Sequence, residues 1–207
     1  YDVTILEDGT YRDLRYEGKK LDQLSNHWTR ITKLSMSASF SKVIAPGLRM
    51  GWLTADKQIF DKLIGLKSGA DIETSNLMMS MVDNYLENND FQAHLQKVRA
   101  VYREKKNAMI DALAKSLPAE AEFTRPQGGF FIYLTMPKEF DMEKFLNEKL
   151  LPEKDVRITP STHLFASGDI KNGARLNFTG EDIPQIKKGI ESLGQALHEV
   201  SAKNLVS

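Results

Sequence analysis

Residues 39–49 read SFSKVIAPGLR, and this stretch constrains the fold and chemistry of the chain more tightly than its other stretches. It places Lys42 among small, polar and apolar residues, and Arg49 follows after a Pro-Gly turn. A lysine that is buried among apolar groups becomes a usable nucleophile, because desolvation favours its neutral amine. Ser39, Ser41 and Arg49 add two hydroxyls and a planar cation, the groups that hold a phosphate monoester.

A nucleophilic amine beside phosphate-binding groups predicts a cofactor with an aldehyde and a phosphate, namely pyridoxal 5'-phosphate (PLP). The same residues also fit a surface loop with a solvated lysine, and their spacing leaves both interpretations open. Residues 39–52 resemble, without a gap, the cofactor-lysine motif of fold type I PLP enzymes, the class I/II aminotransferases. The resemblance implies that Lys42 forms a Schiff base with PLP and that Ser39, Ser41 and Arg49 contribute to its phosphate site.

A short strand and a turn precede this motif. Val3–Leu6 alternates in the manner of a strand, and Asp8 and Gly9 predict a turn at its end, where open α/β sheets place ligands. The residues alone also fit a plain surface turn. The spacing Asp8-x-x-Tyr11 resembles that of aminotransferases, which implies that Asp8 pairs with the pyridine nitrogen and that Tyr11 binds the ring's phenolic oxygen.

Arg175 lies inside a predicted strand, where a charged side chain needs a partner. It fits an edge-strand residue that reaches solvent or a salt bridge, and it also fits a fork that binds a carboxylate in two places. Residues 175–178 resemble the Arg-Leu-x-Phe of aminotransferases, whose arginine binds the α-carboxylate of the amino acid. Residues 126–131 resemble their Pro-x-Gly-Gly-x-Phe loop, which implies that Gly129 lines the substrate site.

Composition narrows the classes of function. The chain has 207 residues, of which 41% are hydrophobic and 27% charged, so it is an ordinary globular sequence. Twenty-eight basic residues balance 28 acidic ones, which argues against nucleic-acid binding, and no apolar run is long enough for a membrane span. Without cysteine the chain has no thiolate chemistry, and we expect a cytoplasmic protein. We predict no metal site, because the histidines lack ligand spacing: His27, His94, His163 and His198.

Hydrophobic periodicity predicts an α/β fold. The resemblance to aminotransferases implies a more specific fold class: the C-terminal part of a PLP-transferase large domain, with a mixed, mostly parallel sheet and helices, followed by a small α+β domain. The expected domains are residues 1–88 of the large PLP-binding domain, an interdomain helix at 89–118, and a small domain at 119–207. The expected strands are 31–36, 50–54, 123–124, 130–135, 156–159 and 174–178. Three helices are expected to begin after the caps Asp56, Asp90 and Asp141, and two more are expected at 77–86 and 183–197. Residues 68–71 are expected to form a loop.

The resemblance implies transamination between an amino acid and a 2-oxo acid, in a homodimer. Similarity in the tract from residues 69–71 to 101–105 is closest to the 2-aminoadipate, aromatic and kynurenine aminotransferases. The chain resembles only the C-terminal half of these enzymes, so we expect a fragment that is inactive by itself. An alternative stays open, because aminotransferase-like domains also serve as effector-binding modules of transcription regulators.

Overall fold

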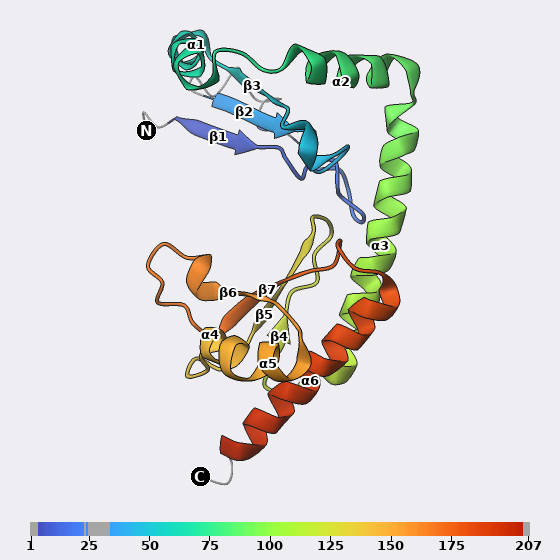
Figure 1. Ribbon diagram of the computed structural model, residues 1–207, viewed down its shortest axis with the longest axis vertical. Coiled ribbons are helices and arrows are strands. Elements are labelled where there is room, and N and C mark those ends of the chain that lie inside the picture. Colours follow the sequence, from blue (N-terminus) through green and yellow to red (C-terminus); the bar gives the residue numbers. More distant parts are fainter. Residues whose placement is uncertain (1–3, 23, 25–33, 205–207) are drawn as a thin grey trace. The chain divides into compact units, whose positions relative to one another are not determined.

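The computed structural model describes residues 4–22, 24 and 34–204, and Figure 1 shows the course of the chain. The chain divides into unit 1, residues 1–99, and unit 2, residues 100–207. The boundary falls inside the long helix α3 (Phe91–Ser116). The division into three segments with bounds at residues 88 and 118 stays a prediction.

Unit 1 contains a three-stranded sheet in the order β1-β2-β3, made of β1 (Ile5–Asp8), β2 (Leu34–Ser39) and β3 (Gly51–Ala55). β1 runs parallel to β2, whereas β3 runs antiparallel to it. The sheet is therefore mixed, as predicted, but the described strands form one parallel and one antiparallel pair, so it is not mostly parallel. The predicted strand residues Val3 and 31–33 lie outside the described part of the chain.

Strand register decides which residues stand at the sheet's edge. Asp8, the last residue of β1, pairs with Ser37 of β2, and Ser39, the last residue of β2, pairs with Gly51. A side chain at Gly51 would lie 2.6 Å from the carbonyl oxygen of Ala38, so the close approach of β3 to β2 requires glycine there. The carboxyl ends of the two parallel strands thus meet at one edge, where the candidate cofactor residues follow.

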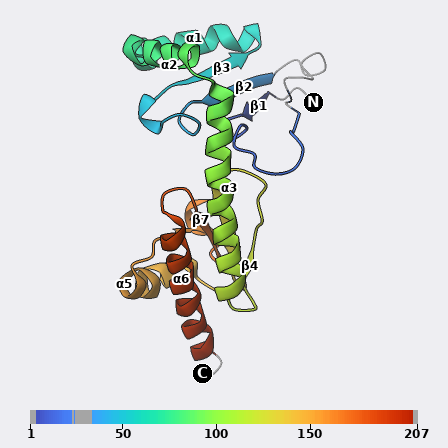
Figure 2. The same cartoon turned by 90° about the vertical axis from the view of Figure 1, so that its right-hand side faces the viewer.

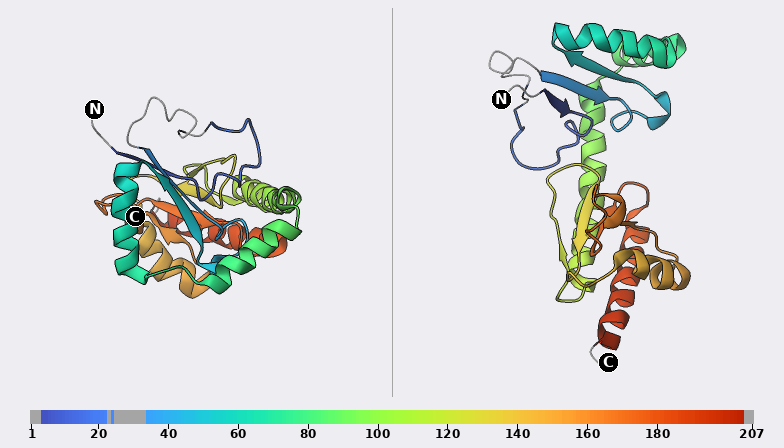
Figure 3. Two further views of the ribbon diagram at one scale, coloured as in Figure 1. Left: turned by 90° about the horizontal axis from the view of Figure 1, so that it is seen from above. Right: turned by 90° about the vertical axis from the view of Figure 1, so that its left-hand side faces the viewer.

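Three helices follow the strands of unit 1, and Figure 3 shows α1 (Lys57–Asp71) in teal and α2 (Asn76–Asn88) in green before α3 begins. Asp90 caps α3 as predicted, because its carboxylate accepts the backbone N–H of Ala93 at 3.0 Å. The predicted loop at residues 68–71 is wrong, since these residues form the last turn of α1. Gly65 and Gly69 lower the helix propensity of this segment, so the sequence suggested that the helix ends earlier. The last turn is nevertheless helical and carries local bonds such as that from Lys67 to Asp71 at 2.7 Å.

Unit 2 contains an antiparallel sheet in the order β4-β5-β7-β6. Its strands are β4 (Glu122–Phe123), β5 (Phe131–Thr135), β6 (Thr159–Pro160) and β7 (Gly173–Asn177). The strand predicted at 156–159 is thus reduced to a two-residue β6. β7 lies between β5 and β6, so its arginine is on an inner strand of this sheet.

One face of this sheet carries the core of unit 2. The helical segment α4 (Met142–Phe145), η3 (Leu146–Leu150) and α5 (Leu151–Lys154) follows β5, with Asp141 capping α4 as predicted, and α6 (Ile183–Asn204) closes the chain. Two short 3₁₀ turns, η2 (Pro46–Leu48) in unit 1 and η4 (Ser161–His163) in unit 2, complete the described elements. Alternate residues of β5 and β7 are buried, and so are residues on one face of α6: Ile132, Leu134, Ala174, Leu176, Leu193 and Leu197. None of the helices in the described part of the chain combines the length and the apolar character needed to cross a bilayer.

Helix α6 approaches the end of α3 so closely that a glycine is required (Figure 2). A side chain at Gly194 would place its Cβ under 3.0 Å from the carbonyl oxygen of Ser116. We expect Gly194→Ala to lower the free energy of unfolding by about 1–3 kcal/mol, because the two helices must move apart. Gly189 of the same helix has open space at this position, so Gly189→Ala should be neutral or stabilise by about 0.5–1 kcal/mol. Urea denaturation of both variants tests this, and equal stabilities would contradict it.

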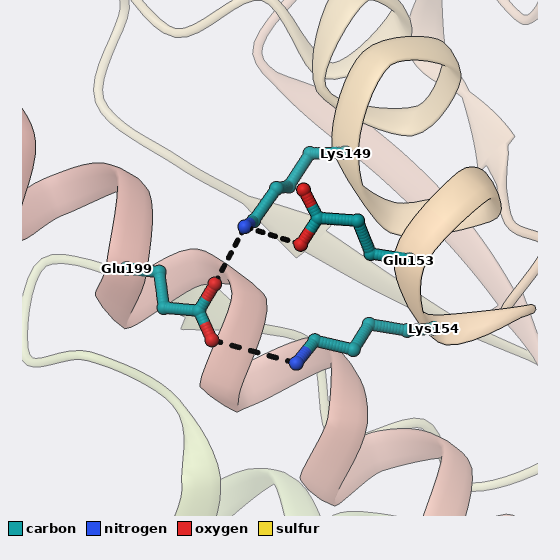
Figure 4. A network of polar contacts seen from close by, with 4 residues as sticks. All are labelled: Lys149, Glu153, Lys154 and Glu199. Atoms are coloured by element: carbon teal, nitrogen blue, oxygen red, sulfur yellow. Dashed lines mark hydrogen bonds and ion pairs between the residues drawn. The ribbon is translucent and has the colours of Figure 1, made fainter.

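Four charged side chains join η3 and α5 to α6, as Figure 4 shows. Lys149 binds Glu153 and, at 2.6 Å, Glu199, whose other oxygen lies 3.4 Å from Lys154. Hydrogen bonds from Lys149 hold the pKa of Glu199 below its ordinary value, and those to Glu153 and Glu199 raise the pKa of Lys149. The network therefore ties the end of the chain to the helical segment after β5.

Removing Glu199 should make the stability of unit 2 less dependent on pH. A carboxylate with a lowered pKa stabilises the folded state above its ordinary pKa, and that contribution is lost as the pH falls through the lowered value. We expect Glu199→Gln to lower the melting temperature at neutral pH, with a difference from wild type that shrinks in acid. The matched control is Glu191→Gln, an exposed glutamate on the same helix. A difference that stays constant with pH would contradict this account.

Candidate cofactor and substrate sites

Lys42 lies on a tight turn that directly follows β2. The backbone N–H of Ile44 donates to the carbonyl of Phe40 at 2.8 Å, and the N–H of Phe40 donates to Met50 at 3.1 Å. These bonds close the turn and fasten its start to the chain before β3. Phe40 also packs on Trp52, with ring centroids 4.9 Å apart. The turn therefore presents Lys42 from a backbone that is bonded on both sides.

Two hydroxyls stand beside the lysine at the end of β2. The side chains of Ser39 and Ser41 hydrogen-bond at 2.9 Å, and the Ser39 hydroxyl also accepts the backbone N–H of Ser41 at 3.1 Å. Ser39 further donates to the carbonyl of Met50 at 3.1 Å. The pair is thus held in place by backbone groups, which is the arrangement expected of a preorganised polar site.

Arg49 has a backbone conformation that is rare for residues with side chains. It follows the 3₁₀ turn η2 with φ at 51°, in the left-handed region. Its Nη1 donates to the carbonyl of Pro46 at 3.2 Å, and the side chain is exposed. Ile72 and Asp155 share this left-handed conformation, so the backbone alone does not assign Arg49 a function.

Asp8 ends β1 as an exposed carboxylate. Hydrogen bonds from the side chain and the backbone of Thr10 hold the pKa of Asp8 below its ordinary value. The backbone N–H of Gly9 donates to the carbonyl of Ser37 at 2.7 Å, which continues the pairing with β2 past the strand end. An aspartate is an anion at neutral pH, and the hydrogen bonds from Thr10 favour that form further, so Asp8 can hold a protonated ring nitrogen.

The two turns meet at Lys42 and Tyr11. The ammonium nitrogen of Lys42 lies 5.9 Å from the centroid of the Tyr11 ring, within the range of a cation–π contact. Unit 1 therefore brings residues of the Asp8–Tyr11 turn and of the lysine turn to one edge of its sheet. The Lys42 side chain is half-buried, which is less than the apolar burial assumed from the sequence.

Arg175 and Gly129 belong to unit 2. Arg175 pairs with Tyr133 and Thr159 across the sheet, on the face opposite the core, and its guanidinium lies 4.3 Å from the centroid of the Phe131 ring. A guanidinium over an aromatic face gains a cation–π contact, which restricts where the group lies. This arrangement suits a fork that binds a carboxylate.

Gly129 shapes the chain just before β5. Its φ of 77° lies in the left-handed region, which glycine adopts without strain. The next residue, Phe130, is buried and meets Tyr102 of α3 edge-on, with centroids 5.0 Å apart. Lys105 of the same helix donates to the carbonyl of Thr179, shortly after β7, at 3.0 Å. Helix α3 thus contacts Phe130, which adjoins Gly129, and Thr179, which lies four residues after Arg175.

Two residues that sequence reasoning missed contact the cofactor turns. Nε2 of His94 lies 2.7 Å from the carbonyl of Val43, and Nε of Arg99 donates to the carbonyl of Asp13 at 2.6 Å. The sequence indicated no role for either residue, because partners that are distant in the chain leave no local pattern. Among the described residues, His, Asp and Glu form no cluster of three that could hold a metal.

Comparison with known proteins relates these features to a family. Over residues 1–193 the chain matches the family described as "Aminotransferase class I and II". The chain belongs to this family. This aminotransferase sequence is 32% identical over 203 residues to aromatic-amino-acid aminotransferase 1 of Thermococcus litoralis, covering 98% of this chain and 48% of that protein.

Its fold also matches solved aminotransferases. The alpha-aminoadipate aminotransferase of Thermus thermophilus, complexed with N-(5'-phosphopyridoxyl)-L-leucine, matches with a TM-score of 0.90 and 34% identity, over 97% of this chain and 51% of that one. The HTH-type transcriptional regulator NorG of Staphylococcus aureus is 28% identical over 190 residues, 92% of this chain and 42% of that protein. The chain therefore spans about half the length of these relatives.

Family membership and the phosphopyridoxyl ligand of the Thermus enzyme support PLP as the cofactor. The donor set of unit 1 fits such a group. It offers an amine at Lys42, hydroxyls at Ser39 and Ser41, a carboxylate kept ionised at Asp8 and a guanidinium at Arg49. These match, in order, the needs of an aldehyde, a phosphate, a protonated ring nitrogen and a second phosphate contact.

Proposed function

We propose that this chain carries the cofactor lysine of an aminotransferase that moves an amino group between an amino acid and a 2-oxo acid. The observation that carries the proposal is the approach of the Lys42 amine to Tyr11, at the sheet edge where β1 ends in Asp8. A lysine and a carboxylate from two neighbouring strand ends are the pair that PLP chemistry requires. Membership of the class I and II aminotransferase family supports the same assignment.

Each residue of unit 1 has a separate task in this proposal. PLP, when bound, supplies an electron sink for the carbanion left after the α-proton of an amino acid is removed. Lys42 binds the aldehyde and then moves the α-proton as a general acid and base. Asp8 keeps the ring nitrogen protonated, and Tyr11 donates a hydrogen bond to the ring's phenolic oxygen. Ser39, Ser41 and Arg49 bind the phosphate.

Arg175 and Gly129 serve the substrate. Arg175 binds the α-carboxylate of the amino acid through two parallel hydrogen bonds, which fix orientation as well as affinity. Gly129 lets the chain turn before β5 with no side chain at the substrate. The cation–π contact of the Arg175 guanidinium with Phe131, which restricts where that group lies, supports this role.

The protein that acts is longer than this chain. The relatives are about twice as long, and β1 and β3 expose apolar side chains that a sheet of this type normally covers: Ile5, Leu6, Trp52 and Leu53. We therefore assign this chain to the C-terminal part of a PLP-transferase large domain and the small domain after it. By itself it binds PLP weakly or not at all and lacks transaminase activity. The complete protein is a cytoplasmic homodimer.

A panel of amino donors tests this function. The full-length protein that carries this chain, supplied with PLP, should show the visible absorption of lysine-bound PLP. It should then convert at least one amino donor to its 2-oxo acid, with a 2-oxo acid as acceptor. Similarity to NorG favours a second candidate, an effector-binding module of a transcription regulator. Ligand-dependent absorption changes without turnover of any donor would favour that module and contradict the enzyme.

A further inference from the structure

The two turns that carry the cofactor residues are each closed by local bonds. In the lysine turn, Ile44 donates to Phe40 at 2.8 Å. In the turn after β1, the N–H of Arg12 donates to Gly9 and that of Leu14 donates to Tyr11, both at 3.0 Å. Such short-range bonds set the shape of each turn. The pairing of β1 with β2 and the bond from Gly9 to Ser37 at 2.7 Å fix where the two turns begin. The parts of each turn farther from the strand ends can be fixed by contacts with another element.

Residues in the N-terminal half of α3 bond to both the lysine turn and the turn after β1. His94 contacts the carbonyl of Val43, the residue after Lys42, at 2.7 Å, and Arg99 donates to the carbonyl of Asp13 at 2.6 Å. Because a carbonyl only accepts, His94 must carry its proton on Nε2. The helix start is itself fixed by Asp90, which caps it. One rigid element thus bonds to a carbonyl in each cofactor turn.

The His94 ring is also held in its plane. Phe91, one turn earlier on α3, stacks on it at an interplanar angle of 17°, with centroids 6.1 Å apart. Tyr85 of α2 meets it nearly at right angles, 85°, with centroids 6.0 Å apart. The ring therefore has little freedom to turn Nε2 away from Val43.

We propose that His94 and Arg99 are positioning residues, which align the Lys42 turn and the Asp8–Tyr11 turn so that both groups address one cofactor. The proposal rests on the assignment of Lys42 and Asp8 to PLP. A displacement of about 1 Å at a catalytic group can cost on the order of a hundredfold in rate, so a bond that fixes the turn has a direct effect on chemistry. In this proposal both residues act through the backbone carbonyls of Val43 and Asp13.

Hydrogen–deuterium exchange on the 207-residue chain tests the two ties without any cofactor. His94→Phe keeps the ring stack and removes the donor, whereas His94→Gln keeps a side-chain N–H. We expect His94→Phe to speed exchange in peptides covering residues 40–50 roughly tenfold, the effect of losing one hydrogen bond. His94→Gln should stay close to wild type. Arg99→Met should loosen residues 9–16 instead, so each variant controls for the other.

The full-length protein supplies a second readout, the visible absorption of lysine-bound PLP. His94→Phe should lower its amplitude at a fixed PLP concentration severalfold, and His94→Gln should restore it. Exposed His163 of unit 2 provides the matched control, as His163→Phe should change neither readout. If both turns exchange at the wild-type rate in His94→Phe and in Arg99→Met, the proposal is overturned. Faster exchange throughout unit 1, equal in His94→Phe and His94→Gln, would also overturn it, because the ring would then only pack the unit.

The two proposals fail in different ways. If lysine-bound PLP persists in a variant without Lys42, the cofactor assignment is wrong. The positioning role of His94 toward the cofactor is then wrong too, even if hydrogen exchange in residues 40–50 still depends on His94. If Lys42 is required for the absorption of lysine-bound PLP but the exchange rate of residues 40–50 does not change in the His94 variants, the cofactor assignment stands and the positioning role of His94 is wrong.

Discussion

Replacing Lys42 with alanine is expected to abolish the absorption of lysine-bound PLP in the full-length protein and to slow amino transfer by roughly 10²–10⁴-fold or more. One amine both binds the aldehyde and moves the α-proton, so its removal affects two functions at once. In the structure this amine stands over Tyr11, on a turn bonded at both ends. Added alkylamine would restore part of the proton transfer without restoring the covalent bond.

A control substitution at another lysine shows whether the effect belongs to Lys42 alone. Lys62 is exposed on α1, and Lys62→Ala should leave absorption and turnover unchanged. Borohydride reduction followed by peptide mass spectrometry should place the cofactor on the tryptic peptide that contains Lys42. If the variant without Lys42 keeps the absorption, another lysine holds PLP, and the interpretation of residues 39–49 is wrong.

Local patterns predicted most elements of the fold. The apolar steps along residues 91–113 and the proline at 118 predicted α3, and the structure confirms this helix from Phe91 to Ser116. The caps at Asp90 and Asp141 were also predicted, since a cap depends on neighbours within one turn. The end of α1 was missed because glycine lowers helix propensity by an amount that other interactions can offset.

Long-range features are less visible in a sequence. The bonds from His94 and Arg99 join residues 51 and 86 positions apart, and no short pattern encodes them. The burial of Lys42 depends on everything that surrounds the turn, so an apolar neighbourhood in sequence did not ensure a buried side chain. The short motif around Lys42 identified the family because its residues act on one ligand and stand close together in the chain.

Arg175 should control how tightly the amino acid is held, with no effect on the cofactor. We expect Arg175→Gln to lower kcat/KM for amino acids roughly a hundredfold, through loss of a bidentate charge-assisted pair and of substrate orientation. Arg175→Lys should recover little, because an ammonium keeps the charge and loses the planar fork. Steady-state kinetics measure this, while the absorption of lysine-bound PLP should match wild type.

An amine substrate without an α-carboxylate shows whether Arg175 acts by binding the substrate carboxylate or only by packing within the protein. Such a substrate has nothing for the fork to bind, so its turnover should be the same in wild type and in Arg175→Gln. Exposed Arg157, in the same unit, supplies the control, since Arg157→Gln should alter neither substrate. An equal loss for both substrates would mean that Arg175 acts only by packing on Phe131, and the assignment of the carboxylate site would then fall.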